Sequence, residues 1–357
     1  MKIAKVAVIG CGAIASNEHI PAYYKNPMAE IKYLVDMVPQ RAAELAGRYG
    51  VPYTSTDYRE ILRDREVDAV SICTANHTHA DIAIDCLEAG KNVLCEKPAA
   101  ISLESVKKMK DTADRNGKIL NIGVVNRFNT SVNLVKKLIS EGELGKVYHI
   151  YCSFRAHRSI PGLGGQFTSK SKSGGGVLID WGVHFLDIIF YCIGSPKILT
   201  VSGEIYGEMG KNMSDYAFTD MWAGPPDYTG TYDVEDFVTG LVRTSGPSIS
   251  LNGAWAQNIG EQAKYIEFMG DKAGIKLQYG KSFTIYHSRN GALYETIPSF
   301  KSTDMYYDEI DDFLKSSIEG RKSRTNIDNV MITSEVMEAI YKSAEIKREV
   351  ILPTEPS

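Results

Sequence analysis

Three side chains able to hold or move a proton stand in the apolar segment GGGVLIDWGVHFLD, residues 174–187. If residues 179–192 form a helix, Asp180, His184 and Asp187 share one polar stripe and the rest of the circumference is apolar. A helix with so much apolar surface is mostly buried, and its polar stripe therefore faces something other than bulk water. The structural alternative is that Asp180 caps the helix and His184 is a hydrogen-bonded core residue.

Another candidate, Lys97, follows the short apolar stretch 92–95 within Glu96-Lys97-Pro98. In a parallel sheet, ligands bind beyond the carboxyl ends of the strands, so Lys97 would lie where a cofactor and a substrate meet. Pro98 fixes its own φ and restricts Lys97, which favours a defined position over that of a solvated surface lysine.

A glycine-rich turn, Gly10-Cys11-Gly12-Ala13-Ile14-Ala15, follows the β-branched run 6–9. This GxGxxA pattern is typical of dinucleotide binding, and Gly10, Gly12, Ala13 and Ile14 are its expected contacts. A second apolar run, 31–35, ends in Asp36, where an acid accepts hydrogen bonds from ribose hydroxyls. Because that carboxylate would repel a 2′-phosphate and no Arg follows it directly, the sequence favours NAD over NADP.

Apolar, strand-like runs and helical segments alternate through the first third of the chain, which predicts a parallel, doubly wound sheet. The strands are expected at 6–9, 31–35, 67–74 and 92–95, and helices up to Tyr24, at 40–49 and up to Ala89. After a helix at 130–140, period-2 segments dominate. They lie at 147–155, 198–206, 234–243, 248–257, 264–269 and 282–287. The expected domains are residues 1–126 and 127–357.

The composition is that of an ordinary globular protein: 357 residues, 43% hydrophobic and 24% charged, with a net charge of −4. Scattered Lys and Arg argue against a nucleic-acid partner, and the absence of a long uninterrupted apolar run argues against a membrane span. The six cysteines form no CxxC pair, which suits reduced thiols and a cytoplasmic location. His77-x-His79 lacks a carboxylate or cysteine at ligand spacing, so no metal is expected. Two glycines interrupt the N-terminal apolar run, which argues against a signal peptide.

The ordered set VAVIGCGAIA, Asp36, TANHTHADIAIDCLEAGKNVLCEKP, GVVNRF and GGGVLIDWGVHFLD resembles the GFO/IDH/MocA family, named for glucose-fructose oxidoreductase, inositol dehydrogenase and rhizopine catabolism. The resemblance implies an N-terminal Rossmann domain, a C-terminal α/β domain with an open, mainly antiparallel sheet, and NAD(P)-dependent redox chemistry on sugars, polyols or inositols. It also implies that Lys97, Asp180 and His184 are catalytic.

The same resemblance implies further contacts. Cofactor contacts are expected from Thr74, Ala75, Asn76, His79, Glu96, Lys97 and Asn126, with Arg127 beside the domain junction. Arg155 and His157 would reach the substrate with Lys97, Asp180 and His184, or else be surface charges at a strand end. Asp187 would orient His184 or serve as a structural acceptor.

Oxidation of a secondary alcohol requires hydride transfer to nicotinamide and removal of the hydroxyl proton. Histidine side chains have a reference pKa of about 6.5 and lysine side chains about 10.4, so His184 is the expected general base. Lys97 would then position the hydroxyl and stabilise alkoxide character, and Asp180 would hold the imidazole or a neighbouring hydroxyl. A depressed lysine pKa would reverse the first two roles.

Two loops and three functions complete the expectations. Residues 159–165 are flexible enough to close over a site. Residues 207–233 carry aromatic and acidic side chains suited to a sugar or a subunit contact, or else are a simple surface elaboration. The leading function is an NAD-dependent dehydrogenase of a sugar, an inositol or a glycoside, for the glycoside at ring C3. The alternatives are an NAD-dependent glycosidase using transient ring oxidation and a non-catalytic NAD-sensing regulator. A homodimer or homotetramer through the C-terminal sheet is expected.

Overall fold

The structure, a computed structural model, describes residues 3–352. The chain divides into two compact units, Met1–Phe128 with Thr303–Met331 and Asn129–Ser302 with Ile332–Ser357. The sequence-based division placed the boundary after residue 126 and assigned everything beyond it to one domain. The structure instead returns the segment Thr303–Met331 to the first unit, because its apolar side chains, including Phe313 and Ile327, pack into that unit's core clusters.

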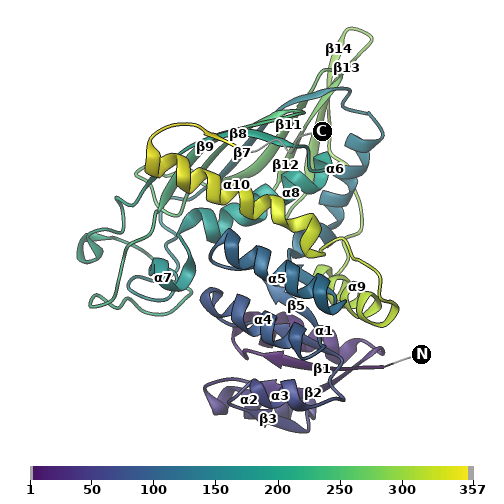
Figure 1. The fold of residues 1–357 in the computed structure, drawn as a ribbon. Helices are drawn as coiled ribbons and strands as arrows, with labels where there is room; N and C mark the ends of the chain where they lie inside the picture. The colour runs from purple at the N-terminus through teal and green to yellow at the C-terminus, as the bar shows by residue number, and fades with distance from the viewer. Residues whose placement is uncertain (1–2, 353–357) are drawn as a thin grey trace. The chain divides into compact units, whose positions relative to one another are not determined.

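The first unit contains a six-stranded parallel sheet with strand order β3-β2-β1-β4-β5-β6, which confirms the predicted doubly wound fold (Figure 1). Its strands are β1 Ala4–Ile9, β2 Ala29–Val35, β3 Tyr53–Ser55, β4 Ala69–Ile72, β5 Asn92–Glu96 and β6 Leu120–Gly123. Its helical segments are η1 Ala15–His19, α1 Ile20–Lys25, α2 Pro39–Tyr49, α3 Arg59–Arg63, η2 Asn76–Thr78, α4 His79–Glu88, α5 Leu103–Asn116, η3 Val125–Phe128 and α9 Met305–Glu319.

Both faces of this sheet are covered. Val6 and Val8 of β1 belong to one apolar cluster, whereas the intervening Ala7 and Ile9 belong to another. Alternate residues of a strand point to opposite faces, so each face has its own core. Near-continuous apolar strands are therefore the expected sequence signature of this sheet, and they are what the chain shows.

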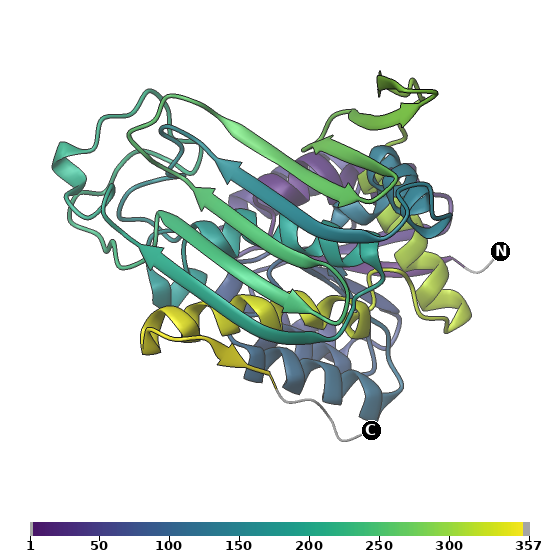
Figure 2. The same ribbon diagram turned by 90° about the horizontal axis from the view of Figure 1, so that it is seen from above.

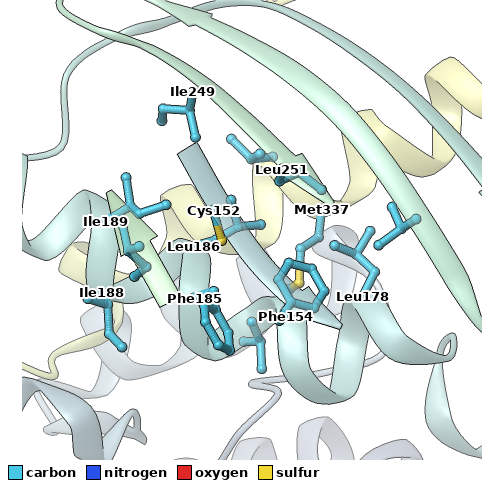
Figure 3. Close-up of a cluster of buried hydrophobic side chains, with 14 of the residues drawn as sticks. Cys152, Phe154, Leu178, Phe185, Leu186, Ile188, Ile189, Ile249, Leu251 and Met337 are labelled. Carbon is cyan, nitrogen blue, oxygen red and sulfur yellow. The ribbon is translucent and has the colours of Figure 1, made fainter. Parts of the chain in front are cut away.

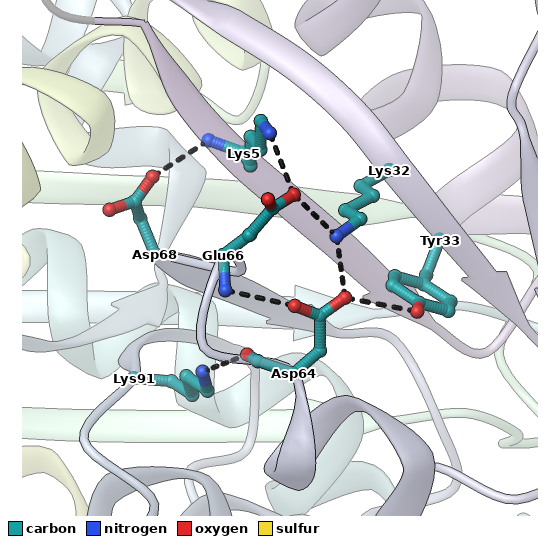
Figure 4. Close-up of polar contacts among 7 residues, drawn as sticks. All are labelled: Lys5, Lys32, Tyr33, Asp64, Glu66, Asp68 and Lys91. Atoms are coloured by element: carbon teal, nitrogen blue, oxygen red, sulfur yellow. Dashed lines mark hydrogen bonds and ion pairs between the residues drawn. The ribbon is translucent and has the colours of Figure 1, made fainter.

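At the amino ends of the strands, charged side chains tie β1 and β2 to the turn before β4 (Figure 4). Lys32 Nζ lies 2.6 Å from Asp64 Oδ2 and 2.8 Å from Glu66 Oε2, and Lys5 N donates to Asp68 Oδ2 at 3.0 Å. Because this cluster is at the amino edge, it leaves the carboxyl edge of the sheet, where ligands bind in such folds, to the loops described below.

The second unit contains a nine-stranded mixed sheet with order β14-β13-β12-β11-β7-β10-β9-β8-β15 (Figure 2). Among the strands described for this sheet, only β7 and β10 pair in parallel, so the expected open, mainly antiparallel sheet is confirmed. The strands are β7 Val147–Arg155, β8 Ile198–Tyr206, β9 Phe237–Thr244, β10 Ser248–Ala254, β11 Ala263–Gly270, β12 Ala273–Gln278, β13 Phe283–Arg289, β14 Ala292–Thr296 and β15 Val350–Ile351. The helical segments are α6 Thr130–Ser140, α7 Lys170–Ser173, η4 Leu178–Gly182, α8 Val183–Ile193 and η5 Met213–Asp215, with α10 Ile327–Ile346 entering from the first unit.

A single apolar cluster joins this sheet to helix α8 (Figure 3). Phe154 of β7 and Phe185 of α8 are both fully buried, with ring centroids 5.1 Å apart. Lys170–Ile193 is a helical stretch long and apolar enough to cross a membrane by composition, but 78% of its most apolar window is buried inside the protein. That burial is typical of a core helix. All six cysteines are unpaired and buried, as expected for core thiols.

The packing around Phe154 generates a stability prediction. A Cβ added to Gly253 of β10 would lie 1.9 Å from the Phe154 ring, whereas one added to exposed Gly260 would meet no heavy atom within 4 Å. Overpacking a filled core costs about 1–3 kcal/mol, so Gly253→Ala should lower the urea midpoint clearly and Gly260→Ala should leave it almost unchanged. Equal midpoints in the two variants would contradict the packing described here.

Candidate active site

The glycine-rich turn lies at the carboxyl end of β1, where a dinucleotide is expected. Gly10 has φ +91°, and a Cβ there would lie 2.5 Å from the Cys73 carbonyl oxygen, so only glycine fits. At Gly12 an added Cβ would meet no protein atom within 4 Å, which leaves open space beside the backbone. The helix that follows supplies free N–H groups. These residues fit a nucleotide diphosphate.

Asp36 supports the same turn from the end of β2. Its Oδ2 accepts a hydrogen bond from Cys11 N at 2.8 Å, and its Oδ1 accepts one from Val38 N at 2.8 Å. The carboxylate is therefore held at the glycine turn, at the position expected to meet a ribose. Ala13 is exposed and Ile14 is half-buried.

The loop after β4 contains Thr74, Ala75 and Asn76, all half-buried at the same sheet edge. Thr78 Oγ1 donates to Thr74 Oγ1 at 2.7 Å and closes the short helix η2. His79 was also expected to contact the cofactor, but its side chain is 1% exposed. Its ring nitrogens lie 2.8 Å from Pro98 O and 3.0 Å from Thr74 O, so the imidazole supports these loops from inside.

Lys97 is half-buried and directly follows Glu96, the last residue of β5. Glu96 is 8% exposed, and its carboxylate lies 2.9 Å from His19 Nε2 and accepts a hydrogen bond from Lys97 N at 3.1 Å. Burial alone would raise the pKa of Glu96, but His19 and Lys97 hold it below its usual value. Glu96 therefore fixes the main chain beside Lys97.

Asn126 and Arg127 lie in η3 and are 5% and 2% exposed. Arg127 donates to Arg324 O at 2.6 Å and to Asn329 O at 2.8 Å, so its guanidinium joins η3 to the returning C-terminal segment. That arrangement gives Arg127 a structural role within the first unit.

In the second unit, the helix that carries Asp180 and His184 differs from the one expected. Its first turn, η4 Leu178–Gly182, is a π-helix, and only α8 is α-helical. Asp180 and His184 are nevertheless both half-buried on an otherwise buried helix, whereas Asp187 is 1% exposed. The polar stripe thus ends in a buried residue, which favours the structural role for Asp187.

A buried carboxylate, Glu235, holds the start of this helix. It accepts hydrogen bonds from Gly176 N at 2.9 Å, Leu178 N at 3.0 Å and the Tyr341 hydroxyl at 2.8 Å. A Cβ on Gly176 would lie 1.9 Å from Glu235 O, which explains a glycine there. Burial raises the pKa of Glu235, and the N–H donors oppose that shift. Sequence reasoning missed this residue because it lies some sixty positions downstream.

Sequence reasoning also missed the side chains beside Asp180. Trp255, fully buried after β10, donates from Nε1 to Asp180 Oδ2 at 3.2 Å. Lys264 Nζ lies 3.6 Å from the centroid of the Trp181 ring. Burial lowers the pKa of Lys264, and the Asp180 carboxylate opposes that shift. The only signal for Trp255 was its position at the end of a period-2 segment.

Arg155 and His157 lie at and just beyond the carboxyl end of β7. Arg155 ends β7 opposite Ala254, is half-buried, and donates from Nε to Ser153 Oγ at 3.1 Å. His157 is exposed. The structure therefore gives Arg155 a defined position one residue from Trp255 in the sheet register, and leaves His157 on the surface of this unit.

The two unusual loops are joined to each other. Ala223 N donates to Pro161 O and Asp227 N to Leu163 O, each at 2.9 Å. Phe167 and Trp222 make an edge contact with ring centroids 4.9 Å apart, and Trp222 remains 65% exposed. The expected flexible segment 159–165 is thus tied by main-chain hydrogen bonds to residues 207–233.

Similarity to known proteins covers both units. Residues 4–124 match an oxidoreductase family with an NAD-binding Rossmann fold, and residues 132–276 match the GFO/IDH/MocA C-terminal domain. The chain is 30% identical over 344 residues to D-glucoside 3-dehydrogenase of Escherichia coli (strain K12), with 96% of this chain and 95% of that protein covered. This chain belongs to the GFO/IDH/MocA family.

Other relatives agree. The chain is 30% identical over 237 residues to scyllo-inositol 2-dehydrogenase (NAD(+)) of Bacillus subtilis (strain 168), covering 64% of this chain and 67% of that protein. Levoglucosan dehydrogenase in complex with NADH has the same fold, with a TM-score of 0.84 at 23% identity over 99% of this chain and 100% of that chain. As a GFO/IDH/MocA protein, the chain is an NAD(P)-dependent oxidoreductase of a family that acts on sugar and inositol hydroxyls.

The Trp255 contact generates a second prediction. Trp255→Phe removes the donor to Asp180, which is worth about 1 kcal/mol, so kcat should fall about five-fold. The matched control is Phe268→Leu, which removes buried ring atoms of β11 and no hydrogen bond. Both variants should lose thermal stability. A kcat unchanged by Trp255→Phe, or lowered equally by Phe268→Leu, would contradict a role for this contact.

Proposed function

We propose that this protein is an NAD-dependent dehydrogenase that oxidises the C3 hydroxyl of a D-glucoside. The proposal rests on one combination: the chain carries the glycine turn, Lys97, Asp180 and His184, and resembles a D-glucoside 3-dehydrogenase over nearly its whole length. Free sugars and inositols are the nearest competing substrates, because an inositol dehydrogenase is also among the relatives.

Bound nicotinamide would accept a hydride from the carbon being oxidised. The chain's own residues then have to manage the hydroxyl proton. His184 accepts that proton as general base, since an imidazole can change its charge near neutral pH. Lys97 contributes a cation that stabilises developing negative charge on the substrate oxygen. Asp180, held by Trp255 Nε1 at 3.2 Å, anchors the imidazole or a neighbouring sugar hydroxyl.

The loop of residues 207–233 would accommodate the aglycone. It presents Trp222, Tyr228 and Phe218, which are 65%, 56% and 37% exposed. Aromatic faces pack well against the C–H faces of a pyranose. Its main-chain bonds to residues 161 and 163 give these rings a fixed support.

A substrate panel tests the proposal directly. Purified protein with NAD should reduce the cofactor fastest with O-glucosides, more slowly with free hexoses, and least with inositols, and the product should be a 3-ketoglucoside. Absorbance of the reduced cofactor and mass and NMR analysis of the sugar give the two readouts. Aglycone release without accumulation of reduced cofactor would instead indicate a glycosidase, and no turnover of any sugar would favour a regulator.

Two variants test the residue roles. Lys97→Met and His184→Ala should each lower kcat by at least about 10², the typical contribution of general acid-base catalysis. Exposed Lys107→Met and half-buried His287→Ala, outside the proposed site, are the matched controls and should keep normal turnover. Near-normal turnover in both site variants would refute the assignment.

Cofactor choice follows from Asp36 within the same proposal. Its carboxylate would bind ribose hydroxyls of NAD and repel the 2′-phosphate of NADP. Asp36→Ser should therefore lower the ratio of kcat/KM for NAD to kcat/KM for NADP by at least about ten-fold, or 1.4 kcal/mol. The ratio is insensitive to a general loss of the turn's order, because such a loss affects both cofactors. An unchanged ratio would contradict this role.

A homodimer or homotetramer through the nine-stranded sheet is part of the proposal. Tyr148 of β7 and Tyr286 of β13 are 54% and 41% exposed, and apolar rings on a sheet favour association.

A further inference from the structure

The carboxyl edge of the first unit's sheet contains a fully buried imidazole that the proposed reaction does not use. His19, at the end of η1, is 0% exposed. Its Nδ1 lies 3.3 Å from Ser71 Oγ and its Nε2 lies 2.9 Å from Glu96 Oε1. The titratable groups that surround it come from five elements or their ends, and are Glu18, Tyr23, Cys73, Glu96 and Glu309.

Through Glu96, His19 acts on the main chain of the lysine. One oxygen of the Glu96 carboxylate faces His19, and the other accepts a hydrogen bond from Lys97 N at 3.1 Å. A Cβ on Gly123 of β6 would lie 2.8 Å from Glu96 Oε1, so a glycine in the adjacent strand makes room for this carboxylate. The Glu96 carboxylate thereby connects the helix that follows the glycine turn to the backbone of Lys97.

A second buried imidazole holds the other side of the same segment. His79 Nδ1 lies 2.8 Å from Pro98 O, one residue after Lys97, and its Nε2 lies 3.0 Å from Thr74 O. Burial lowers the pKa of His79, so its imidazole is neutral and carries one N–H. With that proton on Nδ1, His79 donates to Pro98 O, and its Nε2 only approaches Thr74 O. The main chain of Lys97 and Pro98 is then held from two elements: from η1 through Glu96, and from the start of α4.

We propose that His19 and His79 are positioning residues: they hold the Glu96–Pro98 main chain from both sides and so fix the direction in which Lys97 meets the substrate. This inference rests on the proposed function and deepens it. Neither histidine touches the reacting atoms. The expected consequence of losing either one is a lysine that is still present but poorly placed, which slows the chemical step more than it weakens binding.

The same cluster has the residue types of a metal site, since ligand atoms of His19, Glu96 and Glu309 lie within 4.8 Å of one another. The geometry favours the hydrogen-bonded arrangement. Both His19 nitrogens already face oxygen atoms, and the Glu96 oxygens face His19 and Lys97 N. Burial lowers the pKa of His19, but Cys73 and Glu96 raise it above its usual value overall, which suits an imidazolium paired with a carboxylate.

Four variants of the full-length protein test the proposal. His19→Leu and His79→Leu remove the contacts, His19→Gln keeps an amide able to donate to Glu96, and Val93→Ala is the control. Val93 is fully buried in β5, the strand that ends in Glu96. Its truncation therefore destabilises the same region without removing any hydrogen bond made by His19, Glu96 or His79. The readouts are kcat and KM for sugar and for NAD, measured with unfolding midpoints.

We expect His19→Leu and His79→Leu to lower kcat at least ten-fold with KM for NAD changed less than three-fold. His19→Gln should recover most of the loss, and Val93→Ala should lose stability with kcat within two-fold of wild type. A kcat loss in Val93→Ala equal to that in His19→Leu, or a normal kcat in both leucine variants, would overturn the proposal.

A second measurement does not depend on turnover and separates failure of this inference from failure of the proposed function. Reductive methylation with ¹³C-formaldehyde gives each lysine an NMR signal, and Lys97→Arg assigns that of Lys97. The signal should be distinct in wild type and Val93→Ala, and should shift or broaden in both leucine variants. An unchanged Lys97 signal in those variants, or one equivalent of zinc in the purified protein by elemental analysis, would overturn the inference even if no sugar is oxidised.

Discussion

A buried carboxylate with its oxygens held by hydrogen-bond donors fixes the backbone beside each of the two proposed catalytic segments. In the first unit Glu96 faces His19 Nε2 and accepts from Lys97 N. In the second unit Glu235 accepts from Gly176 N and Leu178 N, directly before Asp180. An ionised carboxylate is costly to bury unless donors replace its water, so each of these groups requires the surrounding backbone to stay in one conformation.

Close approach of Glu96 and Glu235 also explains two glycines. At Gly123 a side chain would collide with Glu96, and at Gly176 it would collide with the Glu235 main chain. Each glycine therefore serves close approach rather than flexibility. The result is a pair of rigid supports, on which half-buried Lys97, Asp180 and His184 are displayed. Rigid support is what transition-state stabilisation by fixed charges requires.

Much of the architecture could be predicted from the sequence. The glycine turn, Asp36 and the alternation of apolar runs and helices predicted the parallel sheet, and period-2 segments predicted most of the second sheet. The strands β3, β6, β12, β14 and β15 were not predicted, and three of them have a local reason. All five residues of β14 are exposed and carry no alternation, β12 begins with Ala-Gly, and β3 has only three residues. The packing of α9 onto the first unit leaves no local signature, since it depends on contacts with η1, α1 and η3, which lie far earlier in the chain.

For the candidate site, the sequence proposes which residues would carry the chemistry, and these roles stay predictions; it did not indicate which residues hold them in place. Lys97, Asp180 and His184 are candidates because polar side chains are unusual in apolar surroundings and because the resemblance implies a catalytic role for them. Trp255 and Glu235 are joined to that helix by tertiary contacts, which no spacing reveals. The π-helical turn at 178–182 was not predicted either, because the sequence pattern was tested only against the α-helical rotation of 100° per residue.

The proposed function requires hydride transfer from a ring carbon of a sugar to the nicotinamide. The most direct measurement is to incubate the protein with NAD and a methyl glucoside carrying deuterium at C3, and to locate the label by mass spectrometry and NMR. The account predicts deuterium at C4 of the reduced nicotinamide, with a 3-ketoglucoside as the product. Deuterium retained in the sugar, or released to water without cofactor reduction, would contradict it.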